Sequence, residues 1–217
     1  MHIFEGVLSV TPHGQEVWLG GAAVAAVGTA IGLYKMDYER IPRVAVLSST
    51  FFVASLISVP MGPTSVHMVL NGLMGLVLGW CAFPAVLVAL VLQAVMFSIG
   101  GPTTLGVNTV IMALPAVMCH YMFRYAVQSR YQPAVFAGGF AAGALGILLG
   151  ATLNATALSL AATSFEVLAQ AVWLWHLPVA LIEGLVTGSV VVFLRKVRPE
   201  VLDAPFLAPA PQEAFLG

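Results

Sequence analysis

Long apolar stretches dominate this chain of 217 residues and limit what it can fold into. A transmembrane helix needs about 20 mostly apolar residues. Only 8% of the residues are charged, whereas soluble domains carry roughly 25%. The pattern therefore predicts an all-α membrane protein with seven transmembrane helices, over residues 17–34, 44–59, 66–80, 84–99, 105–125, 133–161 and 167–194.

The positions of the basic residues predict the orientation of these spans. All eight lie at the end of the first, fifth or seventh predicted span or just after it: Lys35, Arg40, Arg43, Arg124, Arg130, Arg195, Lys196 and Arg198. Loops rich in Lys and Arg face the cytoplasm. Seven spans with the N-terminus outside and the C-terminus in the cytoplasm place all three basic segments on the inner side.

The chain is predicted to form one membrane domain with a short appendage. Residues 1–198 make up the seven-helix domain, in which residues 1–16 form an extracellular N-terminal segment. Residues 199–217 contain four prolines and no helical period, so a mobile cytoplasmic tail is expected. The chain has no nucleotide-binding loop, and Cys81 and Cys119 indicate neither a disulfide framework nor a metal site.

Runs of glycine and alanine predict close approach of helix backbones. They occur in the first and sixth predicted spans, as GGAAVAAVGTAIG and AGGFAAGALGILLGA. In lipid, small residues let helices pack tightly. Packing within this chain is the simpler interpretation, and docking of a partner membrane subunit is the alternative.

The first two residues can chelate a metal ion. The Met1 amine, the His2 amide nitrogen and the His2 Nδ1 close two fused chelate rings with three nitrogens in one plane. A planar nitrogen set suits Ni(II) or Cu(II), whereas Zn(II) prefers a tetrahedron. Alternation of sides puts His67 on the outer face with His2, Thr103, Thr104 and Asn108, which makes a shared site possible. His67 is the predicted fourth ligand, since the only other histidines near the outer ends of the spans are His13 and His176.

Simpler interpretations stand beside this one. A terminal Met-His occurs by chance in many proteins, and His67 could cap a helix or bond a loop. His13, in TPHGQE, is predicted to lie in a surface turn. His176, in WLWHLP, fits an interfacial aromatic belt or a proline kink. His120 lies in mid-span and is expected to bond a neighbouring helix.

Glu183 is the one acid deep in a predicted span. A carboxylate inside a membrane indicates a functional role, or a hydrogen bond to a neighbouring helix, or protonation. The sequence leaves these alternatives open.

Four stretches together resemble a known family: MHIFEGVLS, SVHMVLNGLMGLVLG, GGPTTLGVNTV and ALIEGLVTGSVVVFL. The chain is similar to the substrate-binding (S) component of the nickel and cobalt energy-coupling factor (ECF) transporters, the NikM/CbiM family. The resemblance covers nearly the whole chain. It implies a multi-pass protein of the bacterial or archaeal inner membrane that is not itself an enzyme.

The resemblance also implies the assembly in which such a chain works. The partners would be a coupling membrane (T) component, a small accessory membrane component and cytoplasmic ATPase subunits, within the lipid bilayer and without nucleic acid. The transported ligand would be Ni²⁺ or Co²⁺, with a slight preference for nickel in the sequence, and no organic cofactor is expected.

The resemblance further implies a ligand set and a supporting shell. The Met1 amine, the backbone nitrogen and imidazole of His2, and the His67 imidazole would hold the metal. Residues expected to orient these ligands are Ser65, Thr103, Thr104 and Asn108, and Glu5 is expected to brace the N-terminal segment. Pro102 departs from the family's more common loop, GGLTTLG, so the loop geometry is expected to differ.

Two other functions are alternatives to metal capture. An S component for a vitamin would need a large aromatic-lined outer pocket, and the outer turns do not suggest one. An intramembrane proton-coupled carrier using Glu183 and His120 would need a network of paired acids in the spans. Only one acid is there.

Overall fold

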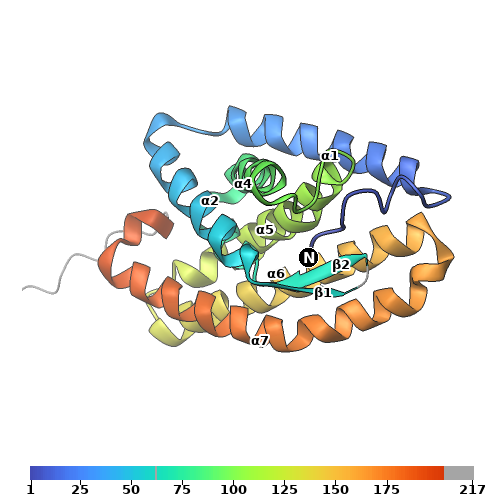
Figure 1. Cartoon of the computed structure of the whole chain (residues 1–217). Coiled ribbons are helices and arrows are strands. Elements are labelled where there is room, and N and C mark those ends of the chain that lie inside the picture. The colour runs from blue at the N-terminus through green and yellow to red at the C-terminus, as the bar shows by residue number, and fades with distance from the viewer. Residues whose placement is uncertain (62, 203–217) are drawn as a thin grey trace, which may run out of the picture.

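The computed structural model describes residues 1–61 and 63–202, and most of them are helical (Figure 1). The α-helices are α1 (Gly14–Tyr34), α2 (Ile41–Leu56), α3 (Asn71–Leu78), α4 (Ala82–Phe97), α5 (Leu105–Val127), α6 (Gln132–Ala161) and α7 (Glu166–Val197). Short 3-10 helices connect or extend them: η1 (Tyr38–Arg40), η2 (Gly79–Cys81), η3 (Thr163–Phe165) and η4 (Pro199–Leu202).

Five helical segments of the described chain are long and apolar enough to cross a bilayer: residues 14–34, 71–97, 105–127, 132–161 and 163–197. The helix α2 has 16 residues and α3 has eight. At 1.5 Å per residue, α3 is only about 12 Å long, against a hydrocarbon core of about 30 Å. The chain is therefore an integral membrane protein rich in helix, and the count of seven spans stays a prediction.

A β-hairpin stands where the sequence predicted the end of the second span and the start of the third. Strand β1 (Ser58–Met61) pairs antiparallel with β2 (Thr64–His67). The prediction of helix up to residue 59 and again from residue 66 was wrong here. Pro60 and Pro63 lack the N–H that a helix interior requires, and a short buried apolar run does not distinguish strand from helix.

The helix α3 is wedged between α5 and α6. A Cβ at Gly72 would collide with the carbonyl of Ala142 in α6, and one at Gly75 with the carbonyl of Ala116 in α5. The chain then bends at Gly79, whose φ of 55° favours glycine, and continues through η2 into α4.

Glycines also bring α6 against α7, which run beside each other along one edge of the molecule (Figure 1). A Cβ at Gly139 would lie 2.9 Å from the Cα of Gly188, and one at Gly143 would lie 2.5 Å from the Glu183 carbonyl oxygen. For α6, these contacts support the interpretation that its small residues serve packing within the chain.

The outward faces of the helices are apolar. Large side chains on α1 and α7 remain exposed, among them Leu19, Val27, Leu181 and Phe193. In a membrane protein such faces contact lipid acyl chains instead of water.

The start of the predicted tail is ordered as η4, in which Leu202 is buried. Arg43 donates to the Glu200 carbonyl over 3.2 Å. The rest of the predicted tail, residues 203–217, lies outside the described residues.

Candidate metal centre

The N-terminal segment runs into the centre of the molecule, between the hairpin and the long helices (Figure 1). Met1 and His2 are 0% and 1% exposed. Ile3 forms an antiparallel bridge with Thr64, and the Ser65 N–H donates to the His2 carbonyl over 3.1 Å. The segment thus lies along β2 and extends the hairpin by its main-chain bonds.

The start of α5 and the loop before it hold the same segment. The Asn108 side chain accepts from the Ile3 N–H over 2.9 Å and donates to the Ile3 carbonyl over 3.0 Å. The Glu5 carboxylate accepts from the Thr103 hydroxyl over 2.8 Å and from its N–H over 3.2 Å. The predicted grouping of these residues on one face agrees with these contacts.

The hairpin contributes further bonds to the main chain of His2. Thr64 donates its hydroxyl to the His2 carbonyl over 2.8 Å, and the Ser65 hydroxyl lies 3.4 Å from the His2 amide nitrogen. Thr104 is buried but bonds the Gly101 carbonyl of its own loop. The residues expected from sequence to orient the ligands therefore hydrogen-bond main-chain groups or each other, and among the printed hydrogen bonds of the described residues none joins them to the His2 ring.

The His2 ring is oriented by Gln93 of α4. The Gln93 amide nitrogen donates to the Phe52 carbonyl over 3.3 Å and to the Ser55 hydroxyl, which leaves its Oε1 facing His2 Nε2 at 3.0 Å. Because that oxygen can only accept, Nε2 carries the proton. The lone pair of His2 is therefore on Nδ1, which is buried without a hydrogen-bond partner.

His67, at the end of β2, is also held by one ring nitrogen. Its Nδ1 lies 2.8 Å from the Met68 carbonyl oxygen, so Nδ1 carries the proton and Nε2 has the lone pair. Nε2 is likewise buried without a partner. The His2 and His67 rings lie 4.6 Å apart between centroids, so two neighbouring imidazoles each have an uncommitted nitrogen.

Burial keeps the nitrogens of this site neutral. It lowers the pKa of the Met1 amine well below its usual value, although the charge of Glu183 opposes the shift. It lowers the pKa of His2 to about 3, helped by the nearby amine, and lowers that of His67 well below its usual value. Neutral amines and imidazoles are the forms that bind metals.

The Met1 side chain fits against a glycine of α6. A Cβ at Gly150 would lie 2.6 Å from the Met1 Cε and 3.1 Å from its sulfur. A glycine here leaves the space that lets the first residue enter the fold.

Glu183 of α7 is tied to the segment that follows His67. Its carboxylate accepts from the N–H groups of Val69 and Leu70 over 2.6 and 2.8 Å. Leu70 has a φ of 56° and precedes α3. Of the alternatives left open by the sequence, these contacts favour the hydrogen bond to a neighbouring segment.

Two of the other histidines are hydrogen-bonded or exposed, and the third is buried. His13 is exposed and lies 3.7 Å from Glu16, as predicted, and His120 bonds the Gly75 carbonyl of α3 over 3.0 Å, also as predicted. The interfacial placement of His176 was wrong: it is 0% exposed, and its Nδ1 bonds the Val172 carbonyl. Its Nε2 is buried without a hydrogen-bond partner among the described residues. A histidine flanked by tryptophans lies at the membrane–water interface only when its side of the helix faces lipid. His176 lies on a side of α7 that packs against protein.

No three His, Cys, Asp or Glu side chains converge on one point within the described ranges. The donor set predicted from sequence does not require three, because two of its four nitrogens belong to the main chain.

Gln93 is the site residue that sequence reasoning missed. It is 0% exposed within α4, whose sequence AFPAVLVALVLQAVMF is otherwise apolar. A single amide in a membrane helix is itself a signal of a buried polar contact. Asn154, which donates to the Thr64 hydroxyl over 3.0 Å, gives the same signal in α6.

A family model described as the cobalt uptake substrate-specific transmembrane region, CbiM, matches residues 2–201. The chain belongs to this family. It is 31% identical to the cobalt transport protein CbiM of Sorangium cellulosum, over 94% of this chain and 95% of that protein. It is also 31% identical to the fused nickel transport protein NikMN of Rhodobacter capsulatus, over 100% of this chain and 67% of that protein.

This CbiM-family chain also resembles solved structures. A crystal structure of a transition metal transporter matches with a TM-score of 0.73 and 25% identity, over 91% of this chain and 93% of that one. A truncated transition metal transporter matches with a TM-score of 0.71 and 26% identity, over 91% and 99%. Its family membership thus identifies the chain as a component of a nickel or cobalt transporter.

Proposed function

We propose that this chain is the substrate-specific component of an ATP-driven ECF importer, and that it captures Ni²⁺ or Co²⁺ on the outer face of the cell membrane. The central observation is the pair of buried, uncommitted nitrogens, His2 Nδ1 and His67 Nε2, beside a buried N-terminus. Buried polar atoms are normally satisfied, so two neighbouring orphans point to a missing ligand.

The four donors are the Met1 amine, the His2 amide nitrogen, His2 Nδ1 and His67 Nε2. Gln93 and the Met68 carbonyl hold the two imidazoles in the tautomers that direct these lone pairs to the ion. The ion takes the place of the His2 amide proton, which is released to solvent. Before binding, this amide N–H donates to the Ser65 hydroxyl oxygen over 3.4 Å. A planar set of nitrogen ligands favours Ni²⁺ over Mn²⁺, Fe²⁺ and Co²⁺, which bind nitrogen ligands more weakly.

Seven crossings, with the N-terminus outside, remain the proposed topology, because they place every basic loop in the cytoplasm. Release of the ion inside requires energy from partners: a coupling membrane component, an accessory membrane component and ATPase subunits. The fused NikMN relative supports the need for further modules, since this chain covers only 67% of its length.

The test is metal binding by the purified, detergent-solubilised protein. We expect about one Ni²⁺ or Co²⁺ ion per chain by elemental analysis, and a large loss of Ni²⁺ affinity in His67→Ala by isothermal titration calorimetry. His13→Ala, which removes an exposed histidine, is the matched control. Native-like Ni²⁺ affinity in His67→Ala would exclude this ligand set, and competition between the two ions would assign the metal.

A further inference from the structure

A third buried imidazole lies outside the proposed donor set. His176 of α7 is 0% exposed. Its Nδ1 lies 2.7 Å from the Val172 carbonyl oxygen, so Nδ1 carries the proton and the lone pair is on Nε2. This Nε2 has no hydrogen-bond partner among the described residues, which is also true of His2 Nδ1 and His67 Nε2. Because buried polar atoms are normally satisfied, the third free nitrogen requires an explanation of its own.

The pairing of α6 with α7 places His176 at the level of Met1. Gly143 packs against the main chain of Glu183, where a Cβ would lie 2.5 Å from the carbonyl oxygen. Gly150 follows Gly143 by seven residues, and His176 precedes Glu183 by seven, which is about two helical turns in each case. Because the two helices run in opposite directions, Gly150 and His176 come to the same level. Gly150 is the residue against which the Met1 side chain packs.

A second set of contacts agrees with this placement. The Trp173 indole N–H, less than one turn from the buried imidazole, donates to the Thr152 hydroxyl of α6 over 3.2 Å. Asn154, further along α6, donates to the Thr64 hydroxyl over 3.0 Å, and that hydroxyl donates to the His2 carbonyl. The same stretch of α6 therefore contacts both this turn of α7 and the hairpin that holds the N-terminal segment.

His176 is not a member of the planar donor set. The four positions of the proposed set are assigned to other nitrogens, and no three His, Cys, Asp or Glu side chains converge on one point in the part of the chain that the structure describes. A neutral imidazole nitrogen is nevertheless an ordinary ligand for Ni²⁺ and related ions. Beside the planar set, such a nitrogen can hold the ion at a second position during entry or release.

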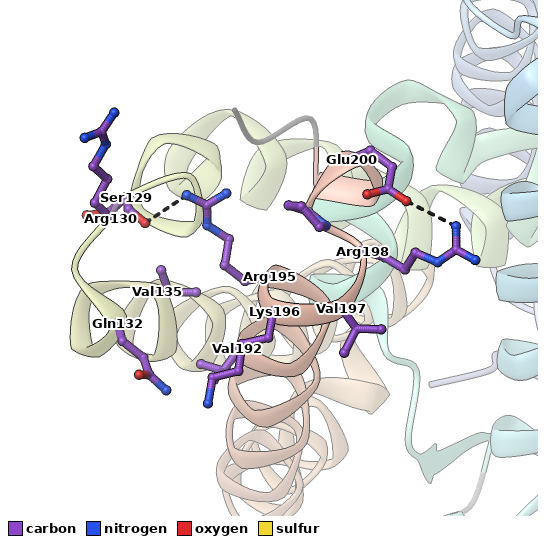
Figure 2. A pocket seen from close by; sticks show the side chains of 11 residues that line it. Ser129, Arg130, Gln132, Val135, Val192, Arg195, Lys196, Val197, Arg198 and Glu200 are labelled. Atoms are coloured by element: carbon purple, nitrogen blue, oxygen red, sulfur yellow. Dashed lines mark hydrogen bonds and ion pairs between the residues drawn. The ribbon is translucent and has the colours of Figure 1, made fainter. Parts of the chain in front are cut away.

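The cationic cavity at the other end of α7 does not suit a metal ion. Its wall carries Arg130, Arg195, Lys196 and Arg198, and Arg198 pairs with Glu200 over 3.3 Å (Figure 2). Guanidinium and ammonium groups have N–H donors and no lone pair. The cavity would repel a divalent cation, so a second position for the ion belongs beside the metal centre.

We propose that His176 Nε2 is a transient ligand of the transported ion, which it holds between solvent and the planar nitrogens. This inference rests on the proposed function. An interaction made only during passage lowers the barrier in both directions and leaves the equilibrium unchanged. His176 therefore controls the rates of Ni²⁺ binding and release, whereas His67 controls the affinity.

The test combines stopped-flow measurement of Ni²⁺ association and dissociation, followed by tryptophan fluorescence of the purified full chain, with calorimetric affinity. In His176→Phe, which keeps a ring without its nitrogens, both rate constants should fall about tenfold while the dissociation constant changes less than about twofold. His176→Gln retains an N–H for the Val172 carbonyl and should show the same slowing. His13→Phe, which changes an exposed histidine in the same way, is the matched control and should keep native rates.

Two results would overturn the proposal. Native rate constants in both His176 variants would exclude a transient ligand. Weaker affinity with faster dissociation would instead make His176 a permanent support of the site. If His176→Phe does not fold, as judged by thermal unfolding, the His176→Gln variant decides alone. A failure of the proposed function is distinct, because the native protein would then lack Ni²⁺ binding that depends on His67.

Discussion

At the scale of single residues, the direction of the His2 lone pair depends on Gln93, a side chain that is not a ligand. The Gln93 amide is itself fixed, because its nitrogen faces the Phe52 carbonyl and the Ser55 hydroxyl. Groups that hold a ligating imidazole by its other nitrogen set its tautomer and raise its basicity. The proposed chelate therefore involves α4 as well as the N-terminus.

Replacing Gln93 with leucine should weaken Ni²⁺ binding by about 10- to 100-fold, because His2 would lose the acceptor that fixes its tautomer. Isothermal titration calorimetry measures this affinity. Gln170→Leu, which changes an exposed glutamine of α7 in the same way, should have little effect. Equal affinities of Gln93→Leu and the native protein would contradict the role given to this residue.

The neutral state of the buried donors predicts a simple pH dependence. Burial depresses the pKa values of the Met1 amine, His2 and His67, so all three remain unprotonated at neutral pH. Only the His2 amide proton then leaves on binding, and affinity should fall about tenfold for each unit of decreasing pH between about pH 8 and about pH 6.

The slope of log affinity against pH checks this account. A slope near one is expected, because fully buried donors bind no competing protons in this range. A slope of two or more would mean that the amine or an imidazole is protonated before the metal enters, which contradicts the depressed pKa values.

The proposed ligands could be named from sequence for a chemical reason: Met1 and His2 are adjacent, and the proposed chelate needs no tertiary structure. His67 and the supporting residues followed from topology and from family resemblance. Gln93 did not follow, because its partner is 91 residues away. Its only trace in the sequence is a single amide in an apolar helix.

At the scale of secondary structure elements, Glu183 connects α7 to the segment that carries His67. Its carboxylate satisfies two buried N–H groups just before α3, a place where the left-handed Leu70 leaves the main chain without helical partners. A buried donor that loses its acceptor costs about 1–3 kcal/mol.

Glu183→Ala should therefore lower the thermal unfolding midpoint and weaken Ni²⁺ binding together, since the same segment positions His67. Differential scanning fluorimetry and calorimetric titration give the two quantities. Glu166→Ala, at the exposed start of α7, is the control and should change neither. A Glu183→Ala variant with native stability and affinity would exclude this connection.

The hairpin shows where hydropathy fails as a guide to elements. The predicted spans ended at residue 59 and began again at residue 66, yet prolines and main-chain pairing make residues 58–61 and 64–67 strands. The bounds of the long helices α1, α5, α6 and α7 were predicted within a few residues. Each of these helices has one long apolar run that no strand or turn interrupts.

At the scale of the whole molecule, the N-terminus serves as a structural element that other elements enclose. The hairpin, α4, α5 and α6 all contact its first five residues. The sequence could indicate that these elements share a face, but not that the first residue would be fully buried. Burial depends on Gly150 and on the hairpin, which are distant in sequence.

This enclosure leads to the most direct test. A variant with a single glycine ahead of Met1 converts the terminal amine into an amide and places an extra residue where there is no room. Its Ni²⁺ affinity, measured by calorimetry beside a control with one glycine added after Gly217, tests the proposed chelate. We predict native affinity in the control and no detectable Ni²⁺ binding in the N-terminal variant, although His2 and His67 are intact; native affinity in that variant would contradict the proposed site.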